Sequence, residues 1–200
     1  MSGSSASLVQ HFIVVRAASS VGDIESLVCD LKIGDPAAKG FAAAELANRA
    51  VNTKYKAEIA RHGAIPLLVA MLTASGGLGI HVETVIRCLG NLASADEANR
   101  AAIGAAGGIE PLVALLLHGT DSQKERAAMA VAHLSLHPAN KLAVLDAGGV
   151  APLQQLAQTG TPSQVERAAR ALRILEARDE DLWSAGLAMP PQGANLYSVN

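Results

Sequence analysis

Residues 106–116 read AGGIEPLVALL, and three other stretches of the chain are variants of the same phrase. HGAIPLLVAML occupies 62–72, VGDIESLVCDL occupies 21–31 and AGGVAPLQQLA occupies 147–157. Their starting points lie 41 or 44 residues apart, a period typical of solenoids and other repeat arrays. The repeat therefore decides the fold, and the other residues are compared at equivalent positions of the repeat.

Each repeat is predicted to contain three helices. In the last one, APLQQLAQ forms a helix that ends at Gly160, and SQVERAARALRILEAR (163–178) follows with apolar residues at helical spacing. A shorter helix, NKLAVLDAGG (140–149), precedes the phrase, with Asn140 as the predicted N-cap and two glycines to stop it. Aromatic residues make up only 2% of the chain, and Val or Ile rarely alternate with polar residues, so the sequence gives almost no signal for β-structure.

Two apolar columns recur at fixed positions of the repeat, and alanines occupy the inner face of each third helix, where they let neighbouring helices approach closely. Because one repeat cannot bury its apolar face alone, these columns are expected to form a continuous core. The columns are Leu27, Leu68, Leu112 and Leu153, and Ile24, Ile65, Ile109 and Val150.

With this helix order, glycine placement and period, the chain resembles the armadillo repeat family. The resemblance implies an all-α, right-handed α-solenoid of about four three-helix units, and the glycine-closed short helix favours it over the HEAT alternative. We expect a repeat domain at 21–181, divided into 21–61, 62–105, 106–146 and 147–181. An N-terminal capping helix is expected within 1–20, and an extended tail at 182–200.

Composition restricts the partners. The net charge of −2 and the pI near 6.3 give no basic footprint for nucleic acid, and no apolar stretch reaches the roughly 20 residues that insert into a membrane. Cys29 and Cys88 lie in apolar helical runs, where buried free thiols are expected. These features favour the cytoplasm or the nucleus; one Arg and several Ser within 5–20 keep a mitochondrial presequence as the alternative.

The sequence carries no motif for nucleotide or zinc chemistry, so no enzyme activity and no cofactor are predicted. His133 and His137 have the four-residue spacing of metal ligands on a helix, but no third ligand is nearby, and we interpret them as surface histidines. One alternative remains open: a chaperone-like or lyase-like helical repeat acting on a bound cofactor, with His133, His137 and Arg126 as its polar lining.

The third helices are the expected binding surface, because solenoids bind along their concave side. The resemblance implies an Asn column that clamps a peptide backbone and a Trp one turn earlier. Here the Asn column reads Asn48, Asn91, His133 and Ile174, and no Trp precedes it, so nuclear-signal recognition is not predicted. Arginines recur instead in the two preceding turns. The predicted site residues are Asn48, Arg87, Asn91, Arg126, Met129, His133, Arg167 and Arg170.

The predicted function is a protein-binding scaffold or adaptor that holds an acidic extended segment, since arginines form bidentate pairs with carboxylates. A competing interpretation is that Glu83 with Arg87, and Glu166 with Arg170, are ordinary helix pairs four residues apart. Trp183 and Tyr197 are predicted as additional protein contacts in the tail. The alternative function is a structural subunit docked in a larger complex through its caps and tail.

Overall fold

The computed structural model describes residues 23–74 and 81–188, and within these ranges regular structure is entirely helical. The predicted capping helix and Tyr197 lie outside the described residues. The helices are α2 (Ile24–Ile33), α3 (Pro36–Arg49), α4 (Thr53–Arg61), α5 (Ala64–Ala74), α6 (Val82–Ala93), α7 (Glu97–Ala105), α8 (Ile109–His118), α9 (Asp121–Leu134), α10 (Pro138–Asp146), α11 (Val150–Thr159), α12 (Pro162–Glu176) and α13 (Asp179–Ser184).

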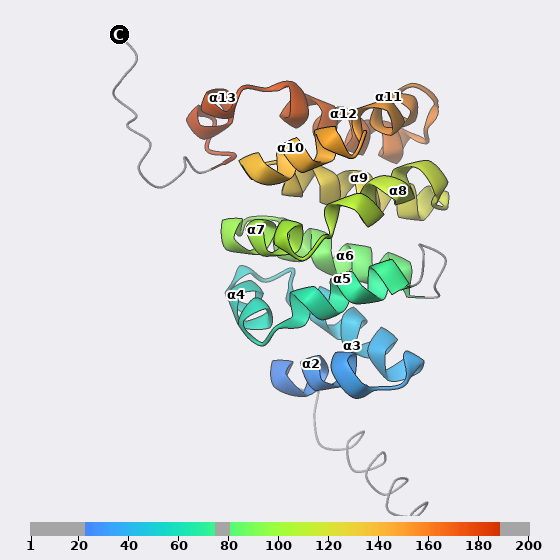
Figure 1. Cartoon of the computed structure of the whole chain (residues 1–200), viewed down its shortest axis with the longest axis vertical. Coiled ribbons are helices and arrows are strands. Elements are labelled where there is room, and N and C mark those ends of the chain that lie inside the picture. Colours follow the sequence, from blue (N-terminus) through green and yellow to red (C-terminus); the bar gives the residue numbers. More distant parts are fainter. Residues whose placement is uncertain (1–22, 75–80, 189–200) are drawn as a thin grey trace, which may run out of the picture.

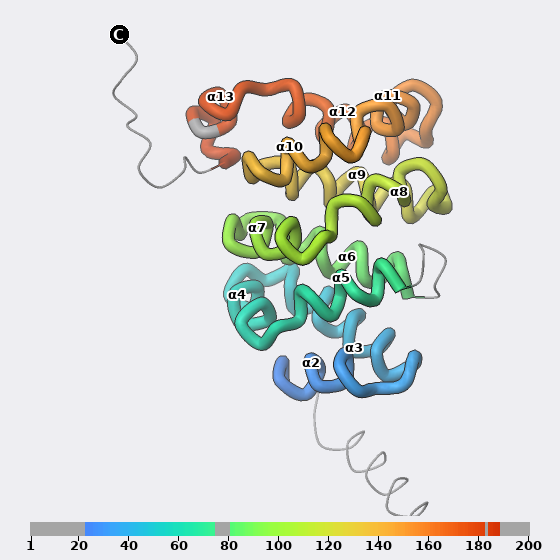
Figure 2. Tube along the Cα trace, viewed as in Figure 1, coloured from blue at the N-terminus to red at the C-terminus, as the bar shows by residue number. Residues whose placement is uncertain are grey.

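The helices stack in chain order along one axis, from α2 and α3 at one end to α11 and α12 at the other (Figure 1). Figure 2 shows α6 and α9 behind α5 and α8, so second and third helices form separate layers. The two strongest contacts join third helices of successive units, α6 with α9 and α9 with α12, and α3 packs against α6 in the same way. The prediction of an all-α solenoid of three-helix units is confirmed.

Short polar caps and glycines fix where the helices begin and end. The hydroxyl of Thr120 accepts a hydrogen bond from the backbone N–H of Gln123, and the Gln123 side chain accepts one from the Thr120 N–H; Thr161 and Gln164 repeat this capping box. Glycines 63, 107 and 148 have φ of 81°, 79° and 73° between the first and second helices of successive units. Glycine suits this left-handed backbone conformation because glycine has no Cβ.

The apolar columns are buried as predicted. Leu27, Leu68, Leu112 and Leu153 are at most 2% exposed, and the isoleucines of the second column at most 4%; Val150 is half-buried against the core. The inner alanines of the third helices, including Ala42, Ala127 and Ala168, are completely buried. One continuous core therefore runs through the stacked units, as the repeat requires.

The two cysteines differ in their surroundings. Cys88 is buried in α6, where burial raises the pKa of its thiol to about 12, so the thiol stays protonated near neutral pH. Cys29 is only half-buried on α2, and the expectation of two buried thiols was wrong for this residue. Cys29 lies in the first described helix, with α3 and α5 packed against α2.

No single helix in the described ranges is long and apolar enough to cross a membrane. Two sharply bent pairs, Thr53–Arg61 with Ala64–Ala74 and Glu97–Ala105 with Ile109–His118, meet the length and composition criteria only when each pair is taken together.

Asn140 does not cap α10, as the sequence suggested, because the helix begins two residues earlier, at Pro138, with His137 as its N-cap residue. Asn140 is buried inside the helix, and its Nδ2 donates a hydrogen bond of 2.7 Å to the backbone carbonyl of Arg100 on α7. Its Oδ1 lies only 1.8 Å from where a Cβ on Gly104 would sit. Asn140 therefore joins the first helices of two successive units.

We expect Gly104→Ala to lower the free energy of unfolding by about 1 kcal/mol. The new methyl group displaces the Asn140 amide and leaves buried polar groups unpaired, at about 1–3 kcal/mol, while replacing a helical glycine by alanine returns about 1 kcal/mol. Urea unfolding measures the net change in the free energy of unfolding. In an Asn140→Ala background only the helix gain remains, so Gly104→Ala becomes stabilising; an unchanged sign in the two backgrounds contradicts this contact.

Candidate functional site

The four third helices, α3, α6, α9 and α12, lie side by side and form a face that we call the third-helix face. All eight site residues predicted in the repeat domain lie on these helices. Of the two predicted tail contacts, Trp183 falls within α13, and residue 182, where the tail was expected to begin, is also inside this helix. Leu182 and Ala188 are buried, so the chain is packed against the last unit beyond the expected boundary.

Two side chains of the Asn column, Asn91 and His133, are hydrogen-bonded to the preceding third helix. Asn91 Nδ2 donates to the backbone carbonyl of Ala47 over 2.9 Å, and His133 Nδ1 lies 3.1 Å from the carbonyl oxygen of Gly90. Because a carbonyl only accepts, Nδ1 of His133 carries the proton, and Nε2 is the acceptor in the neutral ring. These bonds fix the orientation of both side chains on the third-helix face.

The His133 ring is neutral near pH 7. Burial lowers its pKa most, the hydrogen bond to Gly90 raises it, and the positive charges of Arg170, Arg100 and Lys56 lower it further. Both the low-dielectric surroundings and the nearby cations disfavour the charged ring.

Three of the four predicted site arginines are paired across units. Arg87 donates to Asn48 Oδ1 over 2.8 Å. Arg126 Nε lies 3.9 Å from a Glu83 carboxylate oxygen, and Arg167 Nε lies 3.7 Å from one of Glu125. In the part of the chain that the structure describes, no ion pair joins Glu83 to Arg87 or Glu166 to Arg170, so the helix pairs expected from the spacing are not formed.

The inter-unit pairs change the charge of the face. Glu83 and Glu125 partly neutralise Arg126 and Arg167, whose side chains are about one third exposed (36% and 35%). Arg170 is exposed, and among the described residues it forms neither a hydrogen bond nor an ion pair. Among the four arginines of the predicted site, Arg170 is therefore the most available to a partner.

A second set of basic residues was not recognised from the sequence. Lys56, Arg100 and Lys141 occupy the fourth position of the first helices α4, α7 and α10. Lys56 donates to Ser94 Oγ (2.6 Å), Arg100 to the carbonyl of Ala93 (2.9 Å), and Lys141 to the carbonyl of Ala177. They bind the C-terminal ends of third helices, where carbonyls lack helical partners. Their recurrence at the repeat period was a signal for this structural role.

The described residues contain no group of three or more His, Cys, Asp or Glu side chains placed to hold a metal ion. His133 lies on α9 and His137 precedes α10, so the two histidines do not share one helix as their spacing suggested. A small cavity of about 110 Å³ lies among α8, α9, α11 and α12, lined by Leu116, Asp121, Lys124, Gln155, Leu156, Thr159, Gly160 and Gln164. None of the residues suggested as a cofactor lining contributes to it.

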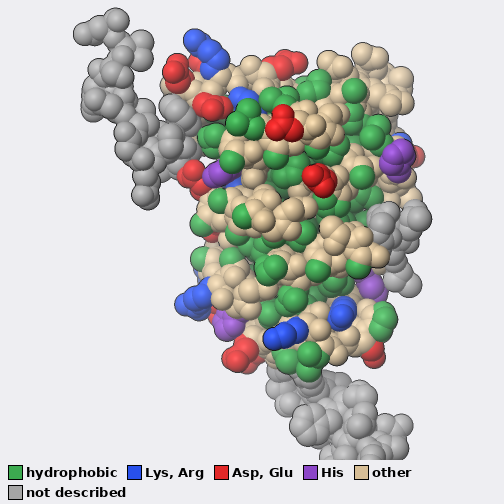
Figure 3. All heavy atoms as spheres, in the orientation of Figure 1, with side chains coloured by type: hydrophobic (Ala, Val, Ile, Leu, Met, Phe, Trp, Pro, Cys, Tyr) green, Lys and Arg blue, Asp and Glu red, His purple; other side chains and the backbone are tan. Residues whose placement is uncertain are grey.

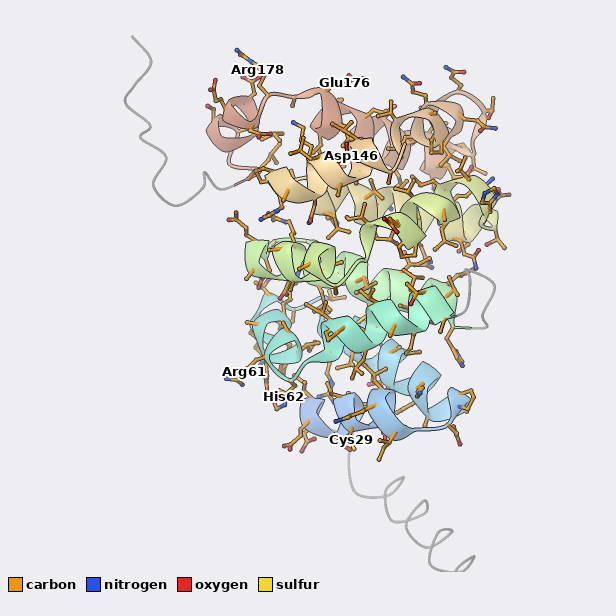
Figure 4. The ribbon with its side chains drawn as sticks, in the orientation of Figure 1. Cys29, Arg61, His62, Asp146, Glu176 and Arg178 are labelled. Atoms are coloured by element: carbon orange, nitrogen blue, oxygen red, sulfur yellow. The ribbon has the colours of Figure 1, made fainter. Side chains whose placement is uncertain are left out.

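The opposite face of the molecule, formed by first and second helices, has a different character. Figure 3 shows apolar and uncharged side chains over most of this face, with isolated charged groups among them. Leu142 and Leu145 of α10 are 61% and 40% exposed, and Leu117 of α8 is 47% exposed. Figure 4 places Arg61 at the end of α4, pointing outward to solvent. The predicted site residues of the repeat domain lie on the other layer, which the third helices form.

Comparison with solved structures identifies the fold. An engineered protein superposes with a TM-score of 0.71 and 32% identity over 82% of this chain and 66% of its own. A designed armadillo repeat protein gives 0.71 and 23%, over 78% of this chain and 65% of its own. Another, in complex with the peptide (KR)4, gives 0.70 and 22%, over 82% and 70%. No model of a known family and no curated protein matches the chain.

The chain spans slightly less than two thirds of the first two of these proteins. The likeness extends over most of this chain, and it includes proteins designed as armadillo repeats. By its fold, the chain is an armadillo-like repeat protein.

Proposed function

From this armadillo-like fold, we propose that the chain is a non-catalytic scaffold that holds an extended, acidic segment of a partner protein along its third-helix face. The observation that carries the proposal is the series of arginines on consecutive third helices, in which Arg170 has no acidic partner among the described residues. The designed armadillo protein in complex with (KR)4 supports a peptide as the ligand. On this chain the arginines belong to the face itself, so the complementary ligand is acidic.

The dimensions of the face suit a short segment. Neighbouring helices pack about 10 Å apart, so four third helices span roughly 40 Å. An extended chain rises about 3.3 Å per residue, and some 12 residues fill this length. Alternate side chains of such a segment point to the same side, so acidic residues at every second position all face the arginines. The peptide (Glu-Ser)6, acetylated and amidated at its ends, is therefore a suitable probe.

Reversing two charges of the third-helix face tests the proposal. We expect the Arg126→Glu, Arg170→Glu double variant to bind (Glu-Ser)6 about tenfold or more weakly than the unaltered chain at low salt, as measured by fluorescence anisotropy. Loss of two attractive pairs and gain of two repulsive ones accounts for at least 1.4 kcal/mol, or about a factor of ten.

A matched control changes the net charge equally without touching this face. Lys54 and Arg61 are exposed on α4, so Lys54→Glu with Arg61→Glu is expected to alter the affinity far less. Circular dichroism spectra establish that both double variants are folded. Equal affinity of the unaltered chain and the Arg126→Glu, Arg170→Glu variant contradicts the proposal, as does equal weakening by the two double variants.

The exposed leucines favour a second candidate function, a structural subunit that docks in a larger complex. Leu142 and Leu145 lie three residues apart on α10, on the face opposite the third helices, and exposed apolar groups of this kind occur at protein interfaces. Size-exclusion chromatography of the native complex tests this role. Leu142→Ser with Leu145→Ser is expected to release the chain as a smaller species; an unchanged elution volume contradicts docking through α10.

A further inference from the structure

His133 stands at a position of the Asn column where two earlier units have asparagine, Asn48 and Asn91. The bond from Nδ1 to the Gly90 carbonyl holds one edge of the ring toward α6. Nε2 lies on the opposite edge of the imidazole ring, and the side chain is half-buried. His133 therefore keeps the inter-unit bond of an asparagine and adds a group that titrates.

Arg170 is placed relative to His133 as Arg87 is placed relative to Asn48. In each pair the arginine lies on the third helix of the next unit. It stands one turn before the residue of that helix that belongs to the Asn column. Arg87 uses this position to donate to Asn48 Oδ1 over 2.8 Å. Arg170 acts electrostatically on His133 but has no hydrogen-bond acceptor among the described residues. The repeat thus places an unused guanidinium beside an imidazole.

We propose that a carboxylate of the bound segment lies between the Arg170 guanidinium and His133 Nε2, and that its binding is coupled to uptake of a proton by the imidazole. This inference rests on the proposed function and specifies the position of one acidic side chain. The protonated ring donates through both nitrogens, from Nδ1 to Gly90 and from Nε2 to the carboxylate. The single negative charge of the carboxylate attracts both positive groups and offsets part of their charge.

The charges around His133 give the direction of the coupling. The groups that act on the ring are Arg170 on α12, Arg100 on α7 and Lys56 on α4, all of them cations. In the free chain they hold the pKa of His133 below its ordinary value of 6.5, together with burial. An added carboxylate opposes them and raises this pKa. Because the complex then holds the proton more tightly than the free chain, affinity rises as the pH falls through this range.

Binding of (Glu-Ser)6 at pH 8.0 and pH 5.5 tests the inference, since the glutamates stay largely ionised at both values. We expect about three- to tenfold tighter binding at pH 5.5, because one unit of pKa difference corresponds to a factor of ten. Proton NMR of the His133 ring provides an independent readout. Its pKa is expected to rise when the peptide is added.

Two variants separate this site from the general increase in positive charge at low pH. His133→Asn restores the side chain of the earlier units, so it is expected to bind the peptide with little difference between the two pH values. His118→Asn removes an exposed histidine of α8 and is expected to keep the full pH dependence. The uncharged peptide (Gln-Ser)6 is expected to show no pH dependence.

The outcomes distinguish this inference from the proposed function. If the unaltered chain binds (Glu-Ser)6 equally at both pH values, or if His133→Asn retains the pH dependence, the proton coupling is overturned while acidic-segment binding stands. If no binding of (Glu-Ser)6 is detected at either pH, both are overturned.

Discussion

Leu112→Ala is expected to lower the free energy of unfolding by about 2–5 kcal/mol, the range for removing a buried leucine side chain and leaving a cavity. Leu112 is completely buried in α8, and it belongs to the column that continues through every unit. Helix α8 packs against α9, α10 and α11. Because the well-packed neighbours cannot all move inward, most of the cavity is expected to remain.

Leu117 provides a control in the same helix. It is 47% exposed, so Leu117→Ala changes the same side chain with little cavity formation, and the cost is expected to stay near 0.5 kcal/mol. Urea unfolding followed by circular dichroism gives both values from the midpoint and slope. Similar losses for the two variants contradict the assignment of Leu112 to the shared core.

The repeat made the architecture predictable from the sequence. A buried column can be recognised in a single chain because every unit places the same residue type at the same packing position. One such column is Leu27, Leu68, Leu112 and Leu153. The glycines at 63, 107 and 148 are visible for the same reason, since each unit needs a left-handed turn at one place. A structural requirement that recurs in every unit therefore produces the same residue type at the same repeat position several times in the sequence.

Contacts of the candidate site were less predictable because they join residues of different units. Glu83 is four residues from Arg87, yet its nearest guanidinium is that of Arg126, 43 residues away in the chain. Asn140 had the residue type of an N-cap, yet it binds the carbonyl of Arg100. Local spacing describes one helix, whereas these partners depend on the registration of neighbouring helices, which the spacing leaves undetermined.

Ala130→Leu is expected to lower the free energy of unfolding by about 3 kcal/mol, at the upper end for inserting extra carbon atoms into a packed core. Ala130 is completely buried in α9. It faces Gly90 of α6 so closely that a Cβ on Gly90 would lie 3.6 Å from the Ala130 Cβ. This contact leaves space for about one methyl group. A leucine adds three carbon atoms to the alanine, so α6 and α9 must move apart.

Separation of α6 from α9 is also expected to affect the candidate site, because the hydrogen bond from His133 on α9 to the Gly90 carbonyl on α6 joins the same two helices. Hydrogen exchange is therefore expected to show faster exchange in α6 and α9 of the Ala130→Leu variant than in α12, which keeps its own contact with α9.

Ala114 is exposed on α8, and Ala114→Leu serves as the control, with a change in the free energy of unfolding within about 0.5 kcal/mol. Equal stability of the two variants would mean that small residues do not set the helix spacing. In that case the alignment of side chains on the third-helix face would need another cause, since the spacing of α6 and α9 determines which groups of successive units lie within hydrogen-bonding distance.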